Sequence, residues 1–198
     1  MIEVENIIDG SVINFCDAPR FKVKHTYLTA NRRLADKGAY LEVATRDNDL
    51  HIGVGSYLEA VKNGENVIKT TQFGAFGEQA VEFNDFDAVQ GETVEVTKYV
   101  SIYTGRDVST EEIPGAVAEE ISAFRRQGFE EEFKEHQAVY DKLWQEADIQ
   151  IGGDFELDRA VRFNIFHLMS TGNEHDDRVN IGAKLLSGEE YGGHAFWD

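Results

Sequence analysis

Cysteine is nearly absent from this sequence, which has one in 198 residues. A single thiol, Cys16, cannot form a disulfide within the chain and fits a reducing compartment. No uninterrupted apolar run approaches the roughly 20 residues of a membrane-spanning helix. The first residues, MIEVENIIDG, lack a basic segment followed by an apolar core, so we expect no secretory signal. Together these absences predict a cytoplasmic protein.

Basic residues are also scarce, because 19 lysines and arginines face 37 acidic residues and leave a formal net charge of −18. Such a charge disfavours association with phosphate backbones and anionic lipids, so we expect neither nucleic acid nor a membrane as a partner. The content of hydrophobic residues (41%) and of aromatic residues (11%) argues against disorder. The length of the chain allows one domain or two.

Residues 11–103 contain short stretches of β-forming residues separated by glycine, asparagine and aspartate, a pattern typical of an antiparallel β-sandwich. The predicted strands are Phe21–Leu28, Gly38–Arg46, Asp49–Ser56, Glu65–Thr70, Gln79–Phe83 and Thr93–Tyr103. The last strand has one face that is apolar except for Lys98 and consists of Val94, Val96, Val100 and Ile102. No catalytic group of residues stands out in this region.

Two groups in the strand region resemble sites, and a structural role is favoured for both. The cluster Asn31–Arg33 could bind an anion, but a solvated turn is the commoner setting for exposed charges. His25 and His51 have no cysteine or carboxylate at ligand spacing, so we expect them to be structural and not metal ligands. The sequence therefore predicts no metal site here.

The pattern becomes helical after residues 105–114. Apolar residues between Val117 and Trp144 recur every three or four positions, and Gly128 is expected to kink or split the helix. The opposite face is rich in glutamate, which we interpret as a solvated surface. A further helix is predicted to start after Asp154, whose side chain can cap it, and to stop at Gly172. Its apolar surface is wider than one stripe, so this helix needs neighbours on more than one side.

The last nineteen residues, Asn180–Asp198, are dense in glycine and end in Phe196, Trp197 and Asp198. Glycines at this density allow tight turns or a close approach to a ligand. A tryptophan beside an aspartate offers a flat apolar face next to a hydrogen-bond acceptor, which suits the C–H faces and hydroxyl edge of a sugar ring. The adjacent acids Glu189 and Glu190 are interpreted as part of a solvated loop and not as a catalytic pair.

Four segments resemble the start of the catalytic domain of the maltose, kojibiose and trehalose phosphorylases, which belong to a glycoside hydrolase family that also holds acid trehalases. These segments are RFNIFHL (Arg162–Leu168), NIGAK (Asn180–Lys184), SGEEYGGH (Ser187–His194) and FWD (Phe196–Asp198). The resemblance implies an internal fragment of a multi-domain α and β enzyme. Residues 1–105 would form a partial β-sandwich, residues 106–153 a helical linker, and residues 154–198 the first hairpin of a truncated catalytic (α/α)6 toroid.

The resemblance also implies an activity: inverting cleavage of an α-linked glucose disaccharide (maltose, kojibiose, nigerose or trehalose). Inorganic phosphate would be the co-substrate, with no further cofactor, and β-glucose 1-phosphate the product. Trp197 and Asp198 match family residues that hold the glucosyl unit, and His194 is close enough in sequence to reach the substrate. The general acid is expected downstream of Asp198, so the chain alone is expected to be inactive. The related phosphorylases are commonly dimers, which implies a homodimer.

Two other functions stay open. The same fold could hydrolyse trehalose with water as the nucleophile, or a truncated chain could serve as a non-catalytic carbohydrate-binding or interaction module. The pattern NIGAK…GEEYGGH…FWD without a signal peptide favours the phosphorylase over a secreted trehalase, and an incomplete barrel argues against the module. Nothing in the sequence separates one disaccharide linkage from another.

Overall fold

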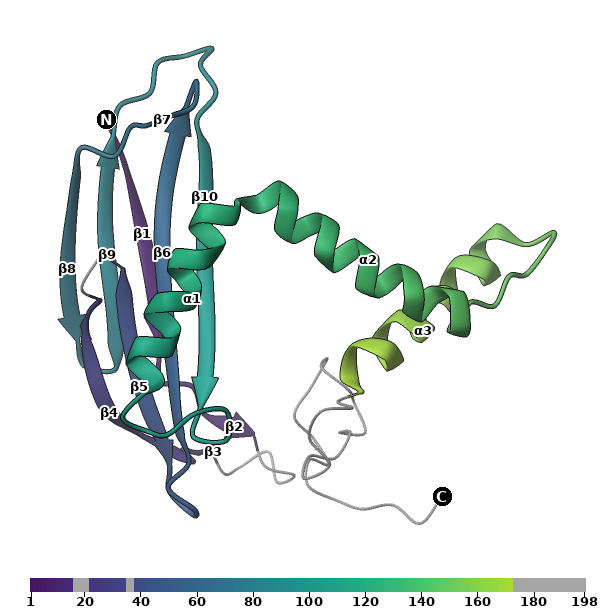
Figure 1. Cartoon of the computed structure of the whole chain (residues 1–198), viewed down its shortest axis with the longest axis horizontal. Helices are drawn as coiled ribbons and strands as arrows, with labels where there is room; N and C mark the ends of the chain where they lie inside the picture. The colour runs from purple at the N-terminus through teal and green to yellow at the C-terminus, as the bar shows by residue number, and fades with distance from the viewer. Residues whose placement is uncertain (16–21, 35–37, 173–198) are drawn as a thin grey trace. The chain divides into compact units, whose positions relative to one another are not determined.

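The computed structural model describes residues 1–15, 22–34 and 38–172 (Figure 1). Ten strands and three helices lie in this described part. The chain divides into two compact units: residues 1–13 with 24–129 form the first unit, and residues 14–23 with 130–198 form the second. The predicted domain boundaries after residues 105 and 153 stay predictions.

The first unit contains two antiparallel sheets. Its strands are β1 (Ile2–Asp9), β4 (Thr26–Arg33), β5 (Ala39–Thr45), β6 (His51–Lys62), β7 (Glu65–Asn66), β8 (Thr70–Phe76), β9 (Gln79–Phe86) and β10 (Glu95–Thr104). The smaller sheet has the order β1-β9-β8, and the larger sheet has the order β10-β6-β5-β4 with β7 paired to β6. In the second unit β2 (Asn14–Phe15) and β3 (Lys22–Val23) form an antiparallel pair. The predicted antiparallel β-structure followed by helices is confirmed.

The two sheets of the first unit face each other across a core that is only partly apolar. An apolar cluster at this interface contains Ile8, Ala39, Leu41 and Ala80, all less than a tenth exposed. The remaining buried positions between the sheets include polar residues, namely Asn6, Ser56, Glu82 and Asn84. Because side chains alternate along a strand, Ala80, Glu82 and Asn84 share the inward face of β9. The interface therefore changes from apolar to polar along its length.

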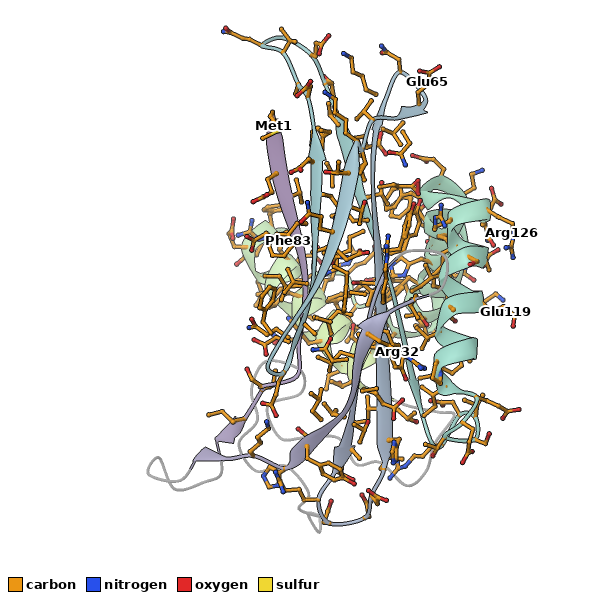
Figure 2. The ribbon with its side chains drawn as sticks, turned by 90° about the vertical axis from the view of Figure 1, so that its left-hand side faces the viewer. Met1, Arg32, Glu65, Phe83, Glu119 and Arg126 are labelled. Atoms are coloured by element: carbon orange, nitrogen blue, oxygen red, sulfur yellow. The ribbon has the colours of Figure 1, made fainter. Side chains whose placement is uncertain are left out.

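Helix α1 (Ile113–Gln127) covers the other face of the larger sheet (Figure 2). Its apolar stripe packs into a second cluster, formed by Leu34, Tyr40, Tyr57, Ile113, Val117 and Ile121. The opposite side of the helix is solvated, and Glu119 and Arg126 point away from the sheet in Figure 2. Glu119 therefore lies on the solvated face that the sequence pattern predicted, whereas for its neighbour Glu120 that prediction is wrong, because this carboxylate is partly buried and accepts a hydrogen bond from the hydroxyl of Ser101 on β10.

Two glycines of β6 allow α1 to approach the sheet closely. A Cβ atom added at Gly53 would lie 2.4 Å from Cγ2 of Ile113, and one added at Gly55 would lie 2.3 Å from Cγ1 of Val117. Any larger side chain at these positions would overlap the helix. The close contact between α1 and β6 therefore depends on glycine at both positions.

Strand β10 presents its more polar face to α1. Ser101 is 3% exposed, and Tyr99 and Tyr103 pack against the α1 cluster. The valine-rich face is the exposed one: Val96 and Ile102 are 44% and 61% exposed. This follows from position, because β10 is the edge strand of the larger sheet, whereas the smaller sheet packs against β5 and β6. The buried face of β10 is the one that meets a neighbouring element. Hydrophobicity alone would predict that the valine-rich face is buried.

The predicted strands agree with the structure in part. Four of them correspond to β5, β6, β9 and β10. The prediction for Phe21–Leu28 is wrong in its middle, because the chain leaves β3 and starts β4 within that range. The predicted turn at Asn31–Arg33 is also wrong, since these residues end β4. Strand β1 was not predicted, and only Asn6 and Ile8 of its residues are buried.

The second unit contains helices α2 (Phe129–Ala147) and α3 (Phe155–Thr171). Gly128, with φ of 82°, separates α1 from α2, so the predicted split of the helix at this glycine is confirmed. Asp154 caps α3, because its Oδ1 accepts a hydrogen bond of 3.0 Å from the backbone N–H of Leu157. The two helices are in contact through Tyr140 on α2 and Ser170 on α3, whose hydroxyl oxygens are 3.1 Å apart.

The apolar surface of α3 is exposed in the described residues. Phe155, Phe163 and Leu168 are 71%, 61% and 60% exposed. A helix with this much uncovered apolar surface requires further packing partners, in agreement with the expectation from its sequence. The toroid itself stays a prediction. Within the described ranges, none of the helices is both long and apolar enough to cross a membrane.

Candidate functional site

The sugar-binding residues predicted from the sequence, His194, Trp197 and Asp198, lie outside the described residues. Three of the four motif segments, Asn180–Lys184, Ser187–His194 and Phe196–Asp198, lie outside them as well. The fourth segment, Arg162–Leu168, belongs to α3. The candidate sites in the described part of the chain are therefore the surroundings of this segment on α3 and the polar clusters of the first unit.

Arg162, the first residue of the motif on α3, connects this helix to the end of α2. Its Nε lies 2.9 Å from Oδ1 of Asp148, and its guanidinium lies over the Trp144 ring at 5.2 Å. A shallow groove of about 340 Å³ is lined by Trp144, Phe155, Asp158, Arg159, Arg162, Phe163 and Phe166. Asp158 also accepts a hydrogen bond of 2.7 Å from the backbone N–H of Ile151. These contacts fix the connection between the two helices, so the described part of the motif has a structural role.

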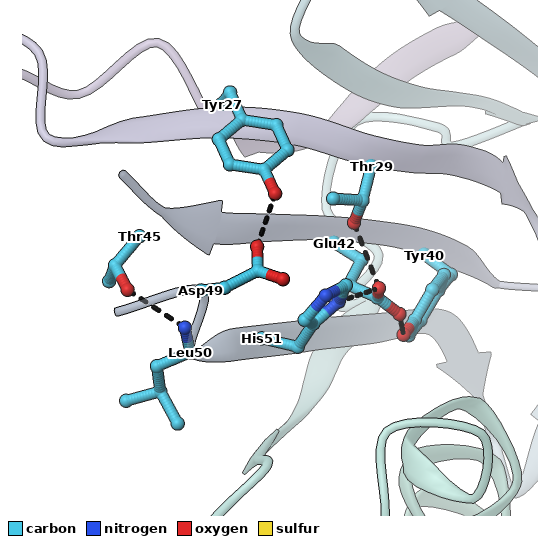
Figure 3. Close-up of polar contacts among 8 residues, drawn as sticks. All are labelled: Tyr27, Thr29, Tyr40, Glu42, Thr45, Asp49, Leu50 and His51. Carbon is cyan, nitrogen blue, oxygen red and sulfur yellow. Dashed lines mark hydrogen bonds and ion pairs between the residues drawn. The ribbon is translucent and has the colours of Figure 1, made fainter. Parts of the chain in front are cut away.

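A first polar cluster surrounds Glu42 on the α1 side of the larger sheet (Figure 3). Its Oε1 accepts a hydrogen bond of 2.8 Å from the hydroxyl of Thr29 and lies 2.8 Å from Nδ1 of His51, while Oε2 accepts from the hydroxyl of Tyr40. Burial alone would raise the pKa of the Glu42 carboxyl, but the hydrogen bonds from Tyr40, His51 and Thr29 hold it below its usual range. Burial and the bond to Glu42 raise the pKa of Tyr40.

The Glu42 cluster has the features of a structural network. Its hydrogen bonds join residues of β4, β5 and β6 within one sheet, and Glu42 is only 7% exposed. The β5–β6 register pairs Ala44 with His51, which brings the imidazole beside a carboxylate nine residues away. Sequence spacing does not reveal this partner of His51, because the contact depends on strand register. Among the described residues, no group of three or more histidine, cysteine, aspartate or glutamate side chains could hold a metal ion.

A second polar cluster lies between the two sheets, around Glu82 of β9. Glu82 is 1% exposed. Its Oε2 accepts a hydrogen bond of 3.1 Å from Nδ2 of Asn6, and its Oε1 accepts one of 2.9 Å from the backbone N–H of Gly38. Asn6 also exchanges hydrogen bonds of 3.0 and 3.2 Å with Ser56. Burial raises the pKa of the Glu82 carboxyl, although these bonds and the charge of Arg33 act in the opposite direction.

The raised pKa of Glu82 predicts a specific pH dependence of stability. Above pH 4.5, the ordinary value for this carboxyl, the unfolded chain loses the proton before the folded chain does, so the folded state binds more protons and is destabilised as the pH rises. The unfolding free energy of the wild type relative to Glu82→Gln should therefore fall as the pH rises above 4.5 and stay constant below pH 4.5. Urea denaturation of both proteins at several pH values measures this difference, and a constant difference across the range would contradict it.

A polar cavity of about 250 Å³ opens beside Glu82. It is lined by Arg33, Tyr57, Leu58, Asn66, Ile68, Lys69, Thr70, Thr71, Glu82 and Asn84, all from the first unit. Asn84 is 1% exposed, and its Oδ1 accepts a hydrogen bond of 2.8 Å from the hydroxyl of Thr71. Its Nδ2 has no hydrogen-bond partner within the described part of the chain. Arg33, interpreted from sequence as part of a solvated turn, is thus a wall of a polar cavity.

Comparison with known proteins assigns different parts of the chain to two domains of one family. Residues 1–143 match the glycosyl hydrolase family 65 N-terminal domain, and residues 162–198 match the glycosyl hydrolase family 65 central catalytic domain. The second match includes α3 from Arg162 onward and all three predicted sugar-binding residues. The predicted motifs and the family match therefore fall on the same part of the chain.

Individual relatives agree with these matches. A kojibiose phosphorylase of Thermoanaerobacter brockii is 44% identical over 202 residues, which cover 100% of this chain and 26% of the relative. A kojibiose phosphorylase of Caldanaerobacter subterraneus subsp. tengcongensis is 45% identical with the same coverage of both chains. A maltose phosphorylase of Bacillus subtilis is 34% identical over 153 residues, or 70% of this chain and 20% of the relative. The chain thus spans about a quarter of the length of the first two relatives.

Proposed function

Because the chain belongs to glycoside hydrolase family 65, we propose that it forms part of an inverting disaccharide phosphorylase. The substrate is an α-linked glucose disaccharide (kojibiose, maltose, nigerose or trehalose), the co-substrate is inorganic phosphate, and the product is β-glucose 1-phosphate. The observation that supports this most directly is the similarity of the whole chain to a kojibiose phosphorylase at 44% identity. No cofactor beyond phosphate is required by this reaction.

The proposed reaction needs a general acid but no general base. An inverting hydrolase uses one carboxylic acid to protonate the leaving group and one carboxylate to activate water. Phosphate is already a nucleophile, so one acid is sufficient, and we place it downstream of Asp198. Within this chain, Trp197 packs beside the glucosyl ring, Asp198 accepts hydrogen bonds from its hydroxyls, and His194 is a further contact. The 198-residue chain by itself is then inactive.

The described residues support the proposed enzyme as a scaffold. The first unit is a β-sandwich covered by α1. In the proposed enzyme α3 is the first helix of the catalytic (α/α)6 toroid, and further helices of that toroid would cover Phe155, Phe163 and Leu168, which are exposed in the described part of the chain. A cytoplasmic location follows from the single cysteine and from a reaction that uses phosphate. A homodimer is proposed for the complete enzyme from its resemblance to related phosphorylases.

The test is the phosphate dependence of glycosidic cleavage. The full-length protein that contains this chain is incubated with each of the four disaccharides, with and without inorganic phosphate, and the products are followed by proton NMR. We expect glucose and β-glucose 1-phosphate to form in equal amounts from one disaccharide, only when phosphate is present. The 198-residue chain alone is the control and should give no turnover.

Two outcomes would contradict the proposal in different ways. Release of glucose from trehalose at the same rate without phosphate would identify a hydrolase of the same family. Formation of the α-anomer of glucose 1-phosphate would contradict inversion while leaving phosphorolysis in place.

A further inference from the structure

We propose that the polar cavity beside Glu82 is a binding site for a small uncharged polyhydroxylated molecule of monosaccharide size. The site is formed by strands of both sheets of the first unit. The proposal does not rest on the phosphorylase activity, because none of the residues that line the cavity belongs to the part of the chain that matches the catalytic domain.

The cavity wall contains a buried side-chain amide that lacks one hydrogen-bond partner. Asn84 is almost completely buried, and its Nδ2 has no partner among the described residues. Reversing the amide would not remove the unpaired atom, because the Thr71 hydroxyl would then accept from Nδ2 and Oδ1 would be left without a partner. A buried N–H that stays unpaired is unfavourable, and nearly all such groups in folded proteins have a partner. A hydroxyl group of a bound molecule that reaches this end of the amide would supply the missing partner.

A hydrogen-bond acceptor, the carboxyl group of Glu82, lies in the wall of the same cavity. Each oxygen of Glu82 accepts one hydrogen bond from inside the protein, from Asn6 or from Gly38. A carboxylate has about four lone-pair sites, so acceptor capacity remains. The guanidinium of Arg33 adds further donors. A hydroxyl group both donates and accepts, so a ligand with several hydroxyls matches a wall in which donors and acceptors occur together.

Charge favours an uncharged ligand. The two cations of the cavity already face acids: Lys69 forms an ion pair with Asp87, and the charge of Arg33 acts on Glu82. An anion such as phosphate would place a second negative charge against the buried Glu82, and a cation would face Arg33 and Lys69. A neutral molecule avoids both costs. Leu58 and Ile68 supply apolar wall that can contact C–H groups.

Size excludes a single bridging water as the complete occupant. The cavity measures about 250 Å³. One water takes up about 30 Å³ in the liquid, so several waters or one molecule of monosaccharide size would fill the space.

The test is an NMR titration of the 198-residue chain with D-glucose and, separately, with inorganic phosphate. We expect a saturable shift of the Asn84 side-chain amide signals with glucose and none with phosphate. Asn84→Leu removes the free donor in a similar volume, and Arg33→Gln removes an exposed wall residue whose loss leaves the core intact. Each variant should raise the dissociation constant for glucose by about ten-fold or more, because a hydrogen bond to a buried or charged group is lost.

The matched control is Arg32→Gln, because Arg32 is the preceding residue of β4 and lies outside this cavity, over the ring of Tyr40 at 5.4 Å. Its affinity for glucose should equal that of the wild type. The proposal is overturned by an Asn84 signal that does not move with glucose, by the same shift with phosphate, or by unchanged affinity in a folded Arg33→Gln protein. Shifts confined to residues 162–198 would also overturn it and would locate sugar binding in the catalytic-domain part alone. Failure of the phosphorolysis experiment would leave these signals unaffected.

Discussion

Replacing Gly55 by valine should destabilise the first unit severely, because α1 lies too close to β6 for any side chain at this position. The added Cβ alone would lie 2.3 Å from Cγ1 of Val117 and 3.0 Å from Cδ1 of Ile121, and both of these residues are buried. Overpacking of a core costs about 1–3 kcal/mol, and more when a backbone must move. Since relief here requires α1 to shift, we expect a loss at the upper end of that range, measured by urea denaturation.

A second glycine, which lies outside the contact between α1 and β6, provides the control. Gly115 lies within α1, and a Cβ atom added there would meet nothing within 4 Å. Gly115→Ala should therefore stabilise the first unit by about 0.5–1 kcal/mol through helix propensity. If Gly55→Val unfolds at the same urea concentration as the wild type, α1 does not pack against β6 as described.

Replacing Asp198 by alanine in the full-length protein should reduce kcat/KM for the preferred disaccharide by about 10- to 150-fold. The proposed role of Asp198 is to accept a hydrogen bond from a hydroxyl of the glucosyl unit, and a bond to a charged group contributes about 1.5–3 kcal/mol. Asp198→Asn keeps the shape and removes the charge, so its kcat/KM should fall between those of the wild type and Asp198→Ala. Initial rates in saturating phosphate measure the effect.

Glu190→Ala is the control for this experiment, since Glu190 lies in the same glycine-rich segment and is interpreted as solvated. Its kcat/KM should equal that of the wild type. Equal kinetics of Asp198→Ala and the wild type on all four disaccharides would refute the proposed contact, whereas a large loss in Glu190→Ala would show that the segment responds to any removed carboxylate.

Local features of the chain were predicted well because their causes are local. Gly128 ends α1 through a backbone conformation that other residues adopt rarely, and Asp154 caps α3 through a bond to a residue three positions away. Strand β1 escaped prediction because its burial depends on pairing with β9, whose residues lie about eighty positions further along. The face of β10 that is buried was likewise not readable, because α1 covers one side of an edge strand.

By itself the sequence determined the family resemblance, the order of strands followed by helices, and the helix ends, because each of these is written in residues that are neighbours along the chain. Only the tertiary structure placed Glu42 beside His51 and made a polar cavity from Arg33, Glu82 and Asn84. The physical reason is that strand register and sheet packing bring together residues far apart in the chain, such as Asn6 and Glu82, which are separated by 76 positions. No spacing in the sequence encodes such a contact.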